Sequence, residues 1–217
     1  MSRKRSKSTD EADEPGGRHR DPVGVRARTL RAAVVEFSQR GYEAASLRAI
    51  GRRAEVSQPL ISYHFGSKEE LWKAVKAEVV AMARTSLMQE VAKRADAVDR
   101  VDAAMVSFFA HAKATPEARR VGLWAQLRGG EEFEGEASML KVVTQLVKQV
   151  QAQGKLRNDV PAEHLVWSFR SAVYEWVGNR DRICSVFGWD PDDPDVDARF
   201  LETLRRMGAH YDRTDSE

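Results

Sequence analysis

The segment from Ser46 to Phe65 constrains the fold of this chain more than any other stretch. Its pattern predicts two short helices joined by a tight turn. Ser46 is the expected N-cap of the first, and Ser57 caps the second with Pro59 in its first turn, where a missing N–H costs nothing. A helix-turn-helix presents the start of its second helix to the DNA major groove, which is wide enough to admit an α-helix. The segment therefore predicts a DNA-binding motif.

The flanking residues predict a helix on either side of this motif. In the preceding helix, apolar residues share one face, and Gly41 supplies a left-handed stop with Tyr42 folding back as an apolar contact. After the motif, Ser67 and Glu70 form a Ser-x-x-Glu capping box. A long amphipathic helix follows and is expected to run to about Arg94. The apolar face of the first helix is Leu30, Ala33, Val34 and Phe37.

The remainder of the chain continues to show helical periodicity, and no period-2 strand pattern occurs. Asp99, Thr115-Pro116 and Pro161 are expected helix starts, while Gly129-Gly130 and Gly154 are expected stops. A turn-rich link at 188–194 precedes a last helix. The predicted fold class is all-α: an N-terminal three-helix helix-turn-helix domain followed by a larger C-terminal helical bundle, with about nine helices in total.

Composition and charge narrow the class of protein. No run of about eighteen apolar residues exists, and no secretory signal pattern follows the basic start, so we expect a cytoplasmic protein. The single cysteine, Cys184, cannot form an internal disulfide. Residues 23–76 carry ten Lys and Arg against five Asp and Glu, whereas residues 77–217 carry 19 against 23. Positive charge thus concentrates where phosphate binding would require it.

Taken together, residues 26–75 resemble the DNA-binding domain of TetR/AcrR-family transcriptional regulators. The matching elements are Phe37–Tyr42, Ser46–Ile50, Val56–Pro59 and Tyr63–Leu71, in order and at the expected spacing. The resemblance implies a homodimer on a pseudo-palindromic operator of double-stranded DNA, with the last two helices forming the dimer interface. Composition predicts a disordered tail at 1–22. The resemblance divides the rest into a helix-turn-helix DNA-binding domain at 23–68 and a ligand-binding and dimerisation domain at 69–217.

The resemblance also assigns the DNA contacts. Arg48 is expected at a base edge or phosphate, Gln58 at adenine, and Lys68 at a phosphate held jointly by the start of the fourth helix. His64 has a buried packing role as its alternative, and Pro59 serves first to shape the helix turn. Glu55 departs from a frequent glycine, and Ser62 from a frequent tyrosine. The complete set is Ser46, Arg48, Gln58, Pro59, Leu60, Ser62, Tyr63, His64 and Lys68.

The aromatic residues of the C-terminal helices have two readings, since such side chains form either a packed core or the wall of an apolar cavity. For the second reading the candidate ligand contacts are Phe108, His111, Trp124, Gln126, Phe169 and Tyr174. The expected effector is a largely apolar small molecule of unknown identity. No cofactor and no metal site are expected, because the histidines lack ligand spacing. The link at 128–132 is expected to be flexible, or to gate a cavity.

These observations favour a ligand-responsive repressor that is released from its operator by a small molecule. The alternative is a DNA-binding regulator without an inducer, acting constitutively or under a protein partner. An enzyme is disfavoured, because no Ser-His-Asp order, paired carboxylates, glycine-rich phosphate loop or metal spacing is present. Contacts between the basic residues of the tail and DNA, and a merely solubilising tail, remain open alternatives.

Overall fold

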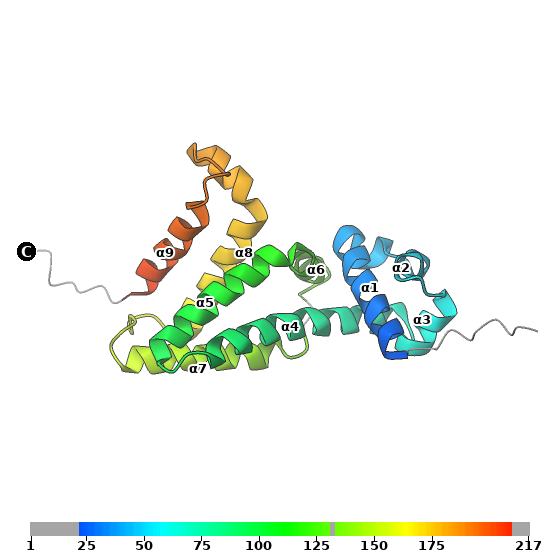
Figure 1. The fold of residues 1–217 in the computed structure, drawn as a ribbon, viewed down its shortest axis with the longest axis horizontal. Helices are drawn as coiled ribbons and strands as arrows, with labels where there is room; N and C mark the ends of the chain where they lie inside the picture. Colours follow the sequence, from blue (N-terminus) through cyan, green and yellow to red (C-terminus); the bar gives the residue numbers. More distant parts are fainter. Residues whose placement is uncertain (1–21, 131–132, 210–217) are drawn as a thin grey trace, which may run out of the picture.

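The computed structural model describes residues 22–130 and 133–209, and over these ranges the chain forms nine α-helices and no strand. In Figure 1 the N-terminal helices lie at one end of the long axis, and the remaining helices extend away from them. The predicted all-α class and helix number are confirmed. The helices are α1 Pro22–Ala44, α2 Leu47–Ala54, α3 Gln58–Phe65, α4 Lys68–Ala92, α5 Ala97–Ala114, α6 Pro116–Leu127, α7 Glu136–Ala152, α8 Ala162–Phe187 and α9 Val196–Gly208.

The first helix is interrupted at Gly41, whose backbone (φ 71°, ψ 179°) departs from helical values before a last short turn ends at Ala44. Residues that carry a side chain rarely adopt this backbone conformation, so glycine is required there. Tyr42 then folds back and stacks on Phe37, with ring centroids 6.1 Å apart. Phe37 in turn meets Trp72 edge to face at 5.0 Å. The predicted stop and its apolar contact are both present.

The turn between α2 and α3 is held by close backbone packing. Ser46 caps α2 by accepting from the Ala49 amide at 3.1 Å, as predicted. The Val56 amide donates to the Gly51 carbonyl at 2.9 Å. A Cβ at Gly51 would lie 2.6 Å from the Val56 carbonyl oxygen, so only glycine lets the turn pass this closely.

The long α4 helix runs from the N-terminal domain into the C-terminal bundle, where α5 lies along it (Figure 1). Ser67 caps its start by accepting from the Glu70 amide at 3.1 Å. The Glu70 carboxylate bonds Lys73 at 2.8 Å. One half of the predicted capping box is therefore observed, and α4 joins both domains as one continuous helix.

The start of α5 differs from the prediction. Asp96, rather than Asp99, occupies the N-cap, and its carboxylate accepts from the Val98 amide at 2.8 Å. Asp99 lies in the first helical turn, where a negative charge still favours the positive end of the helix dipole. Both aspartates precede the same apolar face, so the sequence pattern fits either position.

The helix α6 follows α5 in the C-terminal part of the chain, yet it packs into the apolar core of the N-terminal domain. Val121 and Ala125 are fully buried in the same apolar cluster as residues of α1 to α4. A second cluster, built from α5, α8 and α9, includes Phe109, Val173 and Trp176. The N-terminal domain therefore shares its core with one helix of the C-terminal domain, and a boundary drawn at residue 68 divides side chains that pack together.

The predicted tail lies outside the described residues, except for Pro22 at the start of α1. The Arg128–Glu132 link is described only as far as Gly130. Within 22–130 and 133–209, no helix combines the length and apolar character needed to cross a bilayer.

Candidate nucleic-acid interface and C-terminal cavity

The helix α3 is anchored by one face and leaves the other open. Ile61 and Phe65 are buried, while the candidate contact residues Gln58, Pro59, Leu60 and Ser62 are exposed and Tyr63 is 82% exposed. Ile61 is therefore a core residue of α3, and its neighbour Leu60 is on the surface. The open face stands at the end of the molecule farthest from the bundle (Figure 1).

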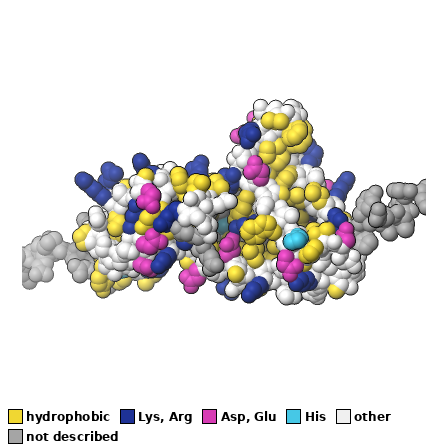
Figure 2. All heavy atoms as spheres, turned by 180° about the vertical axis from the view of Figure 1, so that it is seen from behind, with side chains coloured by type: hydrophobic (Ala, Val, Ile, Leu, Met, Phe, Trp, Pro, Cys, Tyr) yellow, Lys and Arg dark blue, Asp and Glu magenta, His cyan; other side chains and the backbone are white. Residues whose placement is uncertain are grey.

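The charge around this face suits a polyanion. Neither α2 nor α3 contains an acidic residue, and Arg48, Arg52 and Arg53 are exposed along α2. Viewed from behind, Lys and Arg side chains follow the upper edge of the N-terminal domain (Figure 2). Glu55 is the one acid in the intervening turn, and its backbone is left-handed (φ 56°, ψ 44°), a conformation that glycine adopts more readily.

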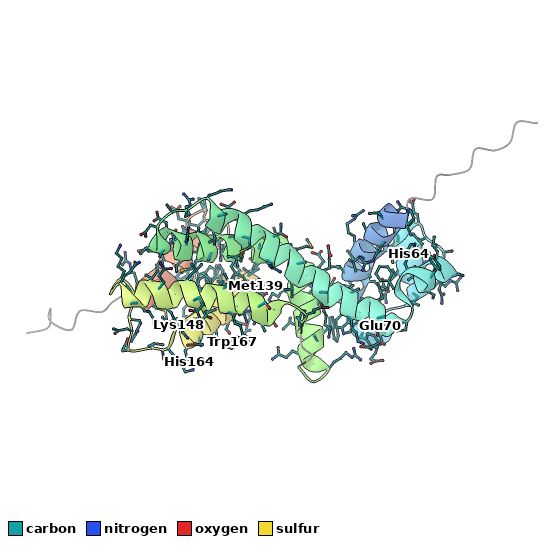
Figure 3. The ribbon with its side chains drawn as sticks, turned by 90° about the horizontal axis from the view of Figure 1, so that it is seen from below. His64, Glu70, Met139, Lys148, His164 and Trp167 are labelled. Carbon is teal, nitrogen blue, oxygen red and sulfur yellow. The ribbon has the colours of Figure 1, made fainter. Side chains whose placement is uncertain are left out.

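Two of the predicted DNA contacts already have partners within the chain. The Lys68 ammonium donates to the Glu43 carbonyl at 3.1 Å and lies 4.6 Å from the centre of the Tyr42 ring. It thus holds the end of α1 against the start of α4. His64 is half-buried and meets Tyr63 edge to face at 5.3 Å, so it lies between the two roles weighed for it. Figure 3 places His64 at the outer end of the domain.

One cation beside α3 was not among the predicted contacts. The Arg26 guanidinium lies 5.0 Å from the centre of the Phe65 ring and is exposed, which places it at the end of the recognition helix. The only signal in the sequence was its position on the polar side of the first helix. Ser46 serves as the N-cap of α2 and is exposed beside Arg48.

The C-terminal domain encloses a cavity of about 490 Å³ between α4, α5, α7, α8 and α9. This volume falls within the range of small-molecule sites. Met139, labelled in Figure 3, lies near the start of α7 on the side towards the N-terminal domain. Most of the wall is aliphatic or aromatic. An apolar hollow of this size means that the aromatic helices do not form a fully packed core.

The predicted ligand contacts divide into three groups. Phe108, His111 and Phe169 line the cavity. Tyr174 stands behind them, with its ring 5.2 Å from Phe108, and burial raises the pKa of its hydroxyl. Trp124 and Gln126 do not line the cavity: Trp124 packs at the junction between the domains, and Gln126 is exposed on α6. Helical spacing alone does not give the direction in which an α6 side chain points.

Polar side chains in the wall are mostly paired with neighbouring side chains of the protein. Arg205 donates to Asp102 at 2.6 Å, and Arg170 donates to Glu136 at 2.5 Å. His111 is half-buried, and burial lowers the pKa of its imidazole. Over the described ranges, no group of three or more His, Cys, Asp or Glu side chains is arranged to hold a metal ion.

A chain of contacts through α6 links the cavity wall to the N-terminal domain. Arg119 donates to the Tyr174 carbonyl on α8 at 2.8 Å, and a Cβ at Gly178 would overlap its guanidinium. At the other end of α6, the Trp124 indole donates to the Ser38 carbonyl at 3.3 Å. Beyond it, the Arg128 guanidinium stacks 3.8 Å from the centre of the Tyr42 ring.

Comparison with known proteins agrees with this architecture. Residues 30–75 match the family model described as bacterial regulatory proteins, tetR family, and residues 101–206 match the tetracyclin repressor-like C-terminal domain. The HTH-type transcriptional repressor NicS of Pseudomonas putida is 26% identical over 82% of this chain and 87% of its own length. The HTH-type transcriptional activator FasR of Mycolicibacterium smegmatis is 38% identical, over 39% of this chain and 38% of its own.

A solved structure shares the fold across nearly the whole length. AibR, crystallised with isovaleryl coenzyme A and operator DNA, superposes with a TM-score of 0.64 at 19% identity, covering 86% of this chain and 98% of AibR. The likeness therefore extends through the N-terminal helices and the C-terminal bundle alike.

Proposed function

Because this chain belongs to the TetR family of DNA-binding transcriptional regulators, we propose that it is a homodimeric repressor released from a palindromic operator by a small molecule. The observation that carries the proposal is the open face of α3, where Gln58 and Tyr63 project beside the cationic α2. A Gln amide pairs with the N6 and N7 edge of adenine, and an exposed tyrosine suits the DNA backbone.

The cavity favours small-molecule control over constitutive binding or control by a protein partner. A regulator without an inducer has no use for an apolar hollow of about 490 Å³ in its C-terminal domain. AibR, whose structure holds both a coenzyme A thioester and operator DNA, is a precedent for two ligands on this fold. NicS is a repressor and FasR is an activator, so the relatives include both signs of regulation. We propose repression for this chain because NicS matches it over the greater length.

Dimerisation is supported by exposed apolar side chains at the end of α8. Val186, Phe187 and Trp189 are 69%, 64% and 46% exposed. In Figure 2, hydrophobic side chains gather on the part of the molecule that projects upward, where α8 ends. Exposed apolar groups gathered in one place are typical of an interaction surface. Trp176, on the same helix, is buried within its own chain and stacks on Phe200 at 4.3 Å.

The mechanism that we propose runs through α6. A molecule that displaces the wall formed by α5 and α8 moves the Tyr174 carbonyl, to which Arg119 of α6 donates. The helix α6 then transmits this shift through Trp124 to α1. In a dimer, a small rotation of each N-terminal domain changes the separation of the two α3 helices. Half-sites lie at a fixed spacing on DNA, so a dimer with the wrong separation engages only one of them.

The experiment that tests this function is selection of bound sequences from random duplex DNA by the purified full-length protein. We expect an inverted repeat whose half-sites lie about one helical turn apart. Gln58→Ala should relax the preference at one position of each half-site, whereas the exposed α7 variant Lys141→Ala should recover the same sequence. Recovery of no enriched sequence would exclude operator binding, and an unrepeated half-site would exclude the dimer.

A further inference from the structure

Apart from the exposed Lys155, the charged side chains of the cavity wall are already paired with neighbours on the protein. Arg205 is paired with Asp102, and Arg170 with Glu136. Arg157 makes two bonds to Asp159, at 2.8 and 2.7 Å. An anionic ligand that used one of these guanidinium groups would have to displace the carboxylate that is already bound to it. A cationic ligand meets the same obstacle at Asp102.

His111 is the exception among the half-buried polar side chains of the wall. Over the described part of the chain, its ring makes no hydrogen bond or ion pair, and burial holds the pKa of the imidazole below its usual value. The two other polar wall residues without a direct bond, Lys155 and Ser168, are exposed to solvent. A neutral imidazole offers one N–H donor and one acceptor nitrogen.

We propose that the effector of this repressor is an uncharged, largely apolar molecule whose single hydroxyl or carbonyl group hydrogen-bonds to His111. The wall around the imidazole, including Phe108, Met139 and Phe169, buries the apolar body. A charged molecule of the same shape binds less well, because the half-buried charges of the wall are already paired and do not offset its desolvation. This inference rests on the proposed function, since it names the ligand that the repressor answers to.

The position of His111 connects this ligand to regulation. Its carbonyl accepts from both the amide and the hydroxyl of Thr115, at 3.0 and 2.7 Å, and Thr115 is the residue that starts α6. A bond made by the imidazole therefore acts on the junction between α5 and α6. From there α6 reaches the N-terminal domain through Trp124.

Displacement of the neutral dye Nile red by three matched ten-carbon compounds tests the ligand class. With the full-length protein at pH 7.5, we expect 1-decanol to compete at a concentration at least tenfold below that of decanoate or decylammonium. A preference for decanoate or decylammonium, or no displacement by 1-decanol, overturns the inference. DNA is absent from this assay, so a protein that binds its operator and prefers decanoate refutes the ligand class alone. A protein that prefers 1-decanol and binds no DNA refutes the proposed function.

Variants of His111 separate a hydrogen bond from general apolar binding. His111→Leu should weaken 1-decanol binding about three- to tenfold, as expected for one net hydrogen bond, while leaving decanoate affinity nearly unchanged. His111→Gln, which keeps a donor and an acceptor, should restore much of the loss. His164→Leu is the matched control, because His164 is exposed on α8 outside the cavity (Figure 3). Thermal melting verifies that each variant is folded, and equal 1-decanol affinity in His111→Leu contradicts the role of the imidazole.

Discussion

The indole of Trp124 lies directly against Gly41, so that a Cβ at position 41 would stand 2.8 Å from the ring. This contact joins α6 to the one interruption in α1, and it places the C-terminal domain against the end of the first helix. Two unrelated demands therefore meet at Gly41. Its backbone needs the conformational freedom of glycine, and its neighbour needs the empty space.

Gly41→Ala should destabilise the protein strongly. The backbone at φ 71° and ψ 179° is strained for any side chain, and the added methyl group overlaps an indole that is fixed by its bond to Ser38. We expect a loss of about 2–4 kcal/mol in the free energy of unfolding, measured by urea denaturation.

Gly122→Ala is the matched control for this substitution. Gly122 lies inside α6 with nothing within 4 Å of its added Cβ, so alanine there should stabilise the protein by about 0.5–1 kcal/mol. Equal effects at positions 41 and 122 would show that the contact with Trp124 has no energetic importance.

Glu55→Gly should stabilise the helix-turn-helix. Glu55 is the one non-glycine residue with positive φ among those described, and this left-handed conformation costs about 1–2 kcal/mol for an L-residue. Part of the gain is lost to the greater entropy of glycine in the unfolded chain, which leaves about 0.5 kcal/mol as a rise in thermal stability. Gln89→Gly, at an exposed right-handed position of α4, should instead lower stability by about 1 kcal/mol. A fall in melting temperature for Glu55→Gly would contradict the strain argument.

Local signals in the sequence were sufficient for the helix-turn-helix. Ser46 and Pro59 act within a few residues of their own position, through a cap and a first helical turn, and the structure places both as expected. The start of α5 shows the limit of such signals. Asp96 and Asp99 are one turn apart, and the tertiary position of the chain decides which of them caps the helix.

Contacts made across the molecule could not be predicted in this way. Trp124 has the spacing of a core residue, yet its surroundings are Gly41 and Ser38, more than 80 residues earlier. Lys68 occupies the sequence position of a phosphate contact, yet in the structure its ammonium donates to the Glu43 carbonyl of its own chain. His111 was selected for its chemistry, and only the packing of α5 and α7 directs it into the cavity. In each case the deciding partner is distant in sequence.

Arg48→Ala should weaken operator binding about tenfold or more without changing the melting temperature, because Arg48 is exposed on α2 and does not belong to the apolar core. The salt dependence distinguishes its two expected targets. Loss of a phosphate contact lowers the slope of log K against log salt by about 1, whereas loss of a base contact relaxes sequence preference. Lys141→Ala on α7 should change neither quantity, and unchanged affinity in Arg48→Ala would remove this residue from the interface.

Lys68→Ala should weaken operator binding and also lower stability by about 1 kcal/mol, since it removes the charged bond to the Glu43 carbonyl. Both quantities must be measured on the same preparation. A stability loss with unchanged affinity at fixed salt would identify Lys68 as a structural link between α1 and α4 and remove it from the DNA contacts.

Asp197 should make the packing of α9 sensitive to acid. Burial alone would raise the pKa of its carboxyl, but hydrogen bonds from Lys113, Trp176 and Arg180 outweigh burial and lower the pKa. The Trp176 and Arg180 bonds are 2.9 and 3.0 Å long, and the Asp197 side chain is 15% exposed. A carboxyl with a lowered folded pKa stabilises the protein above its unfolded pKa of about 3.9, and this contribution is lost as the pH falls through the folded value.

Asp197→Asn tests this dependence. We expect the variant to lose about 1.5–3 kcal/mol of unfolding free energy at pH 7, the worth of hydrogen bonds to a charged group. Its deficit relative to the unmodified protein should shrink as the pH falls below about 3.9, where the carboxyl of the unfolded chain becomes protonated first. Asp181→Asn is the control, since Asp181 is 88% exposed and its contact with Arg180 at 3.7 Å should contribute less than about 0.5 kcal/mol. Urea denaturation at both pH values decides the matter, because a deficit that is the same at pH 7 and pH 3 cannot come from the charge of Asp197.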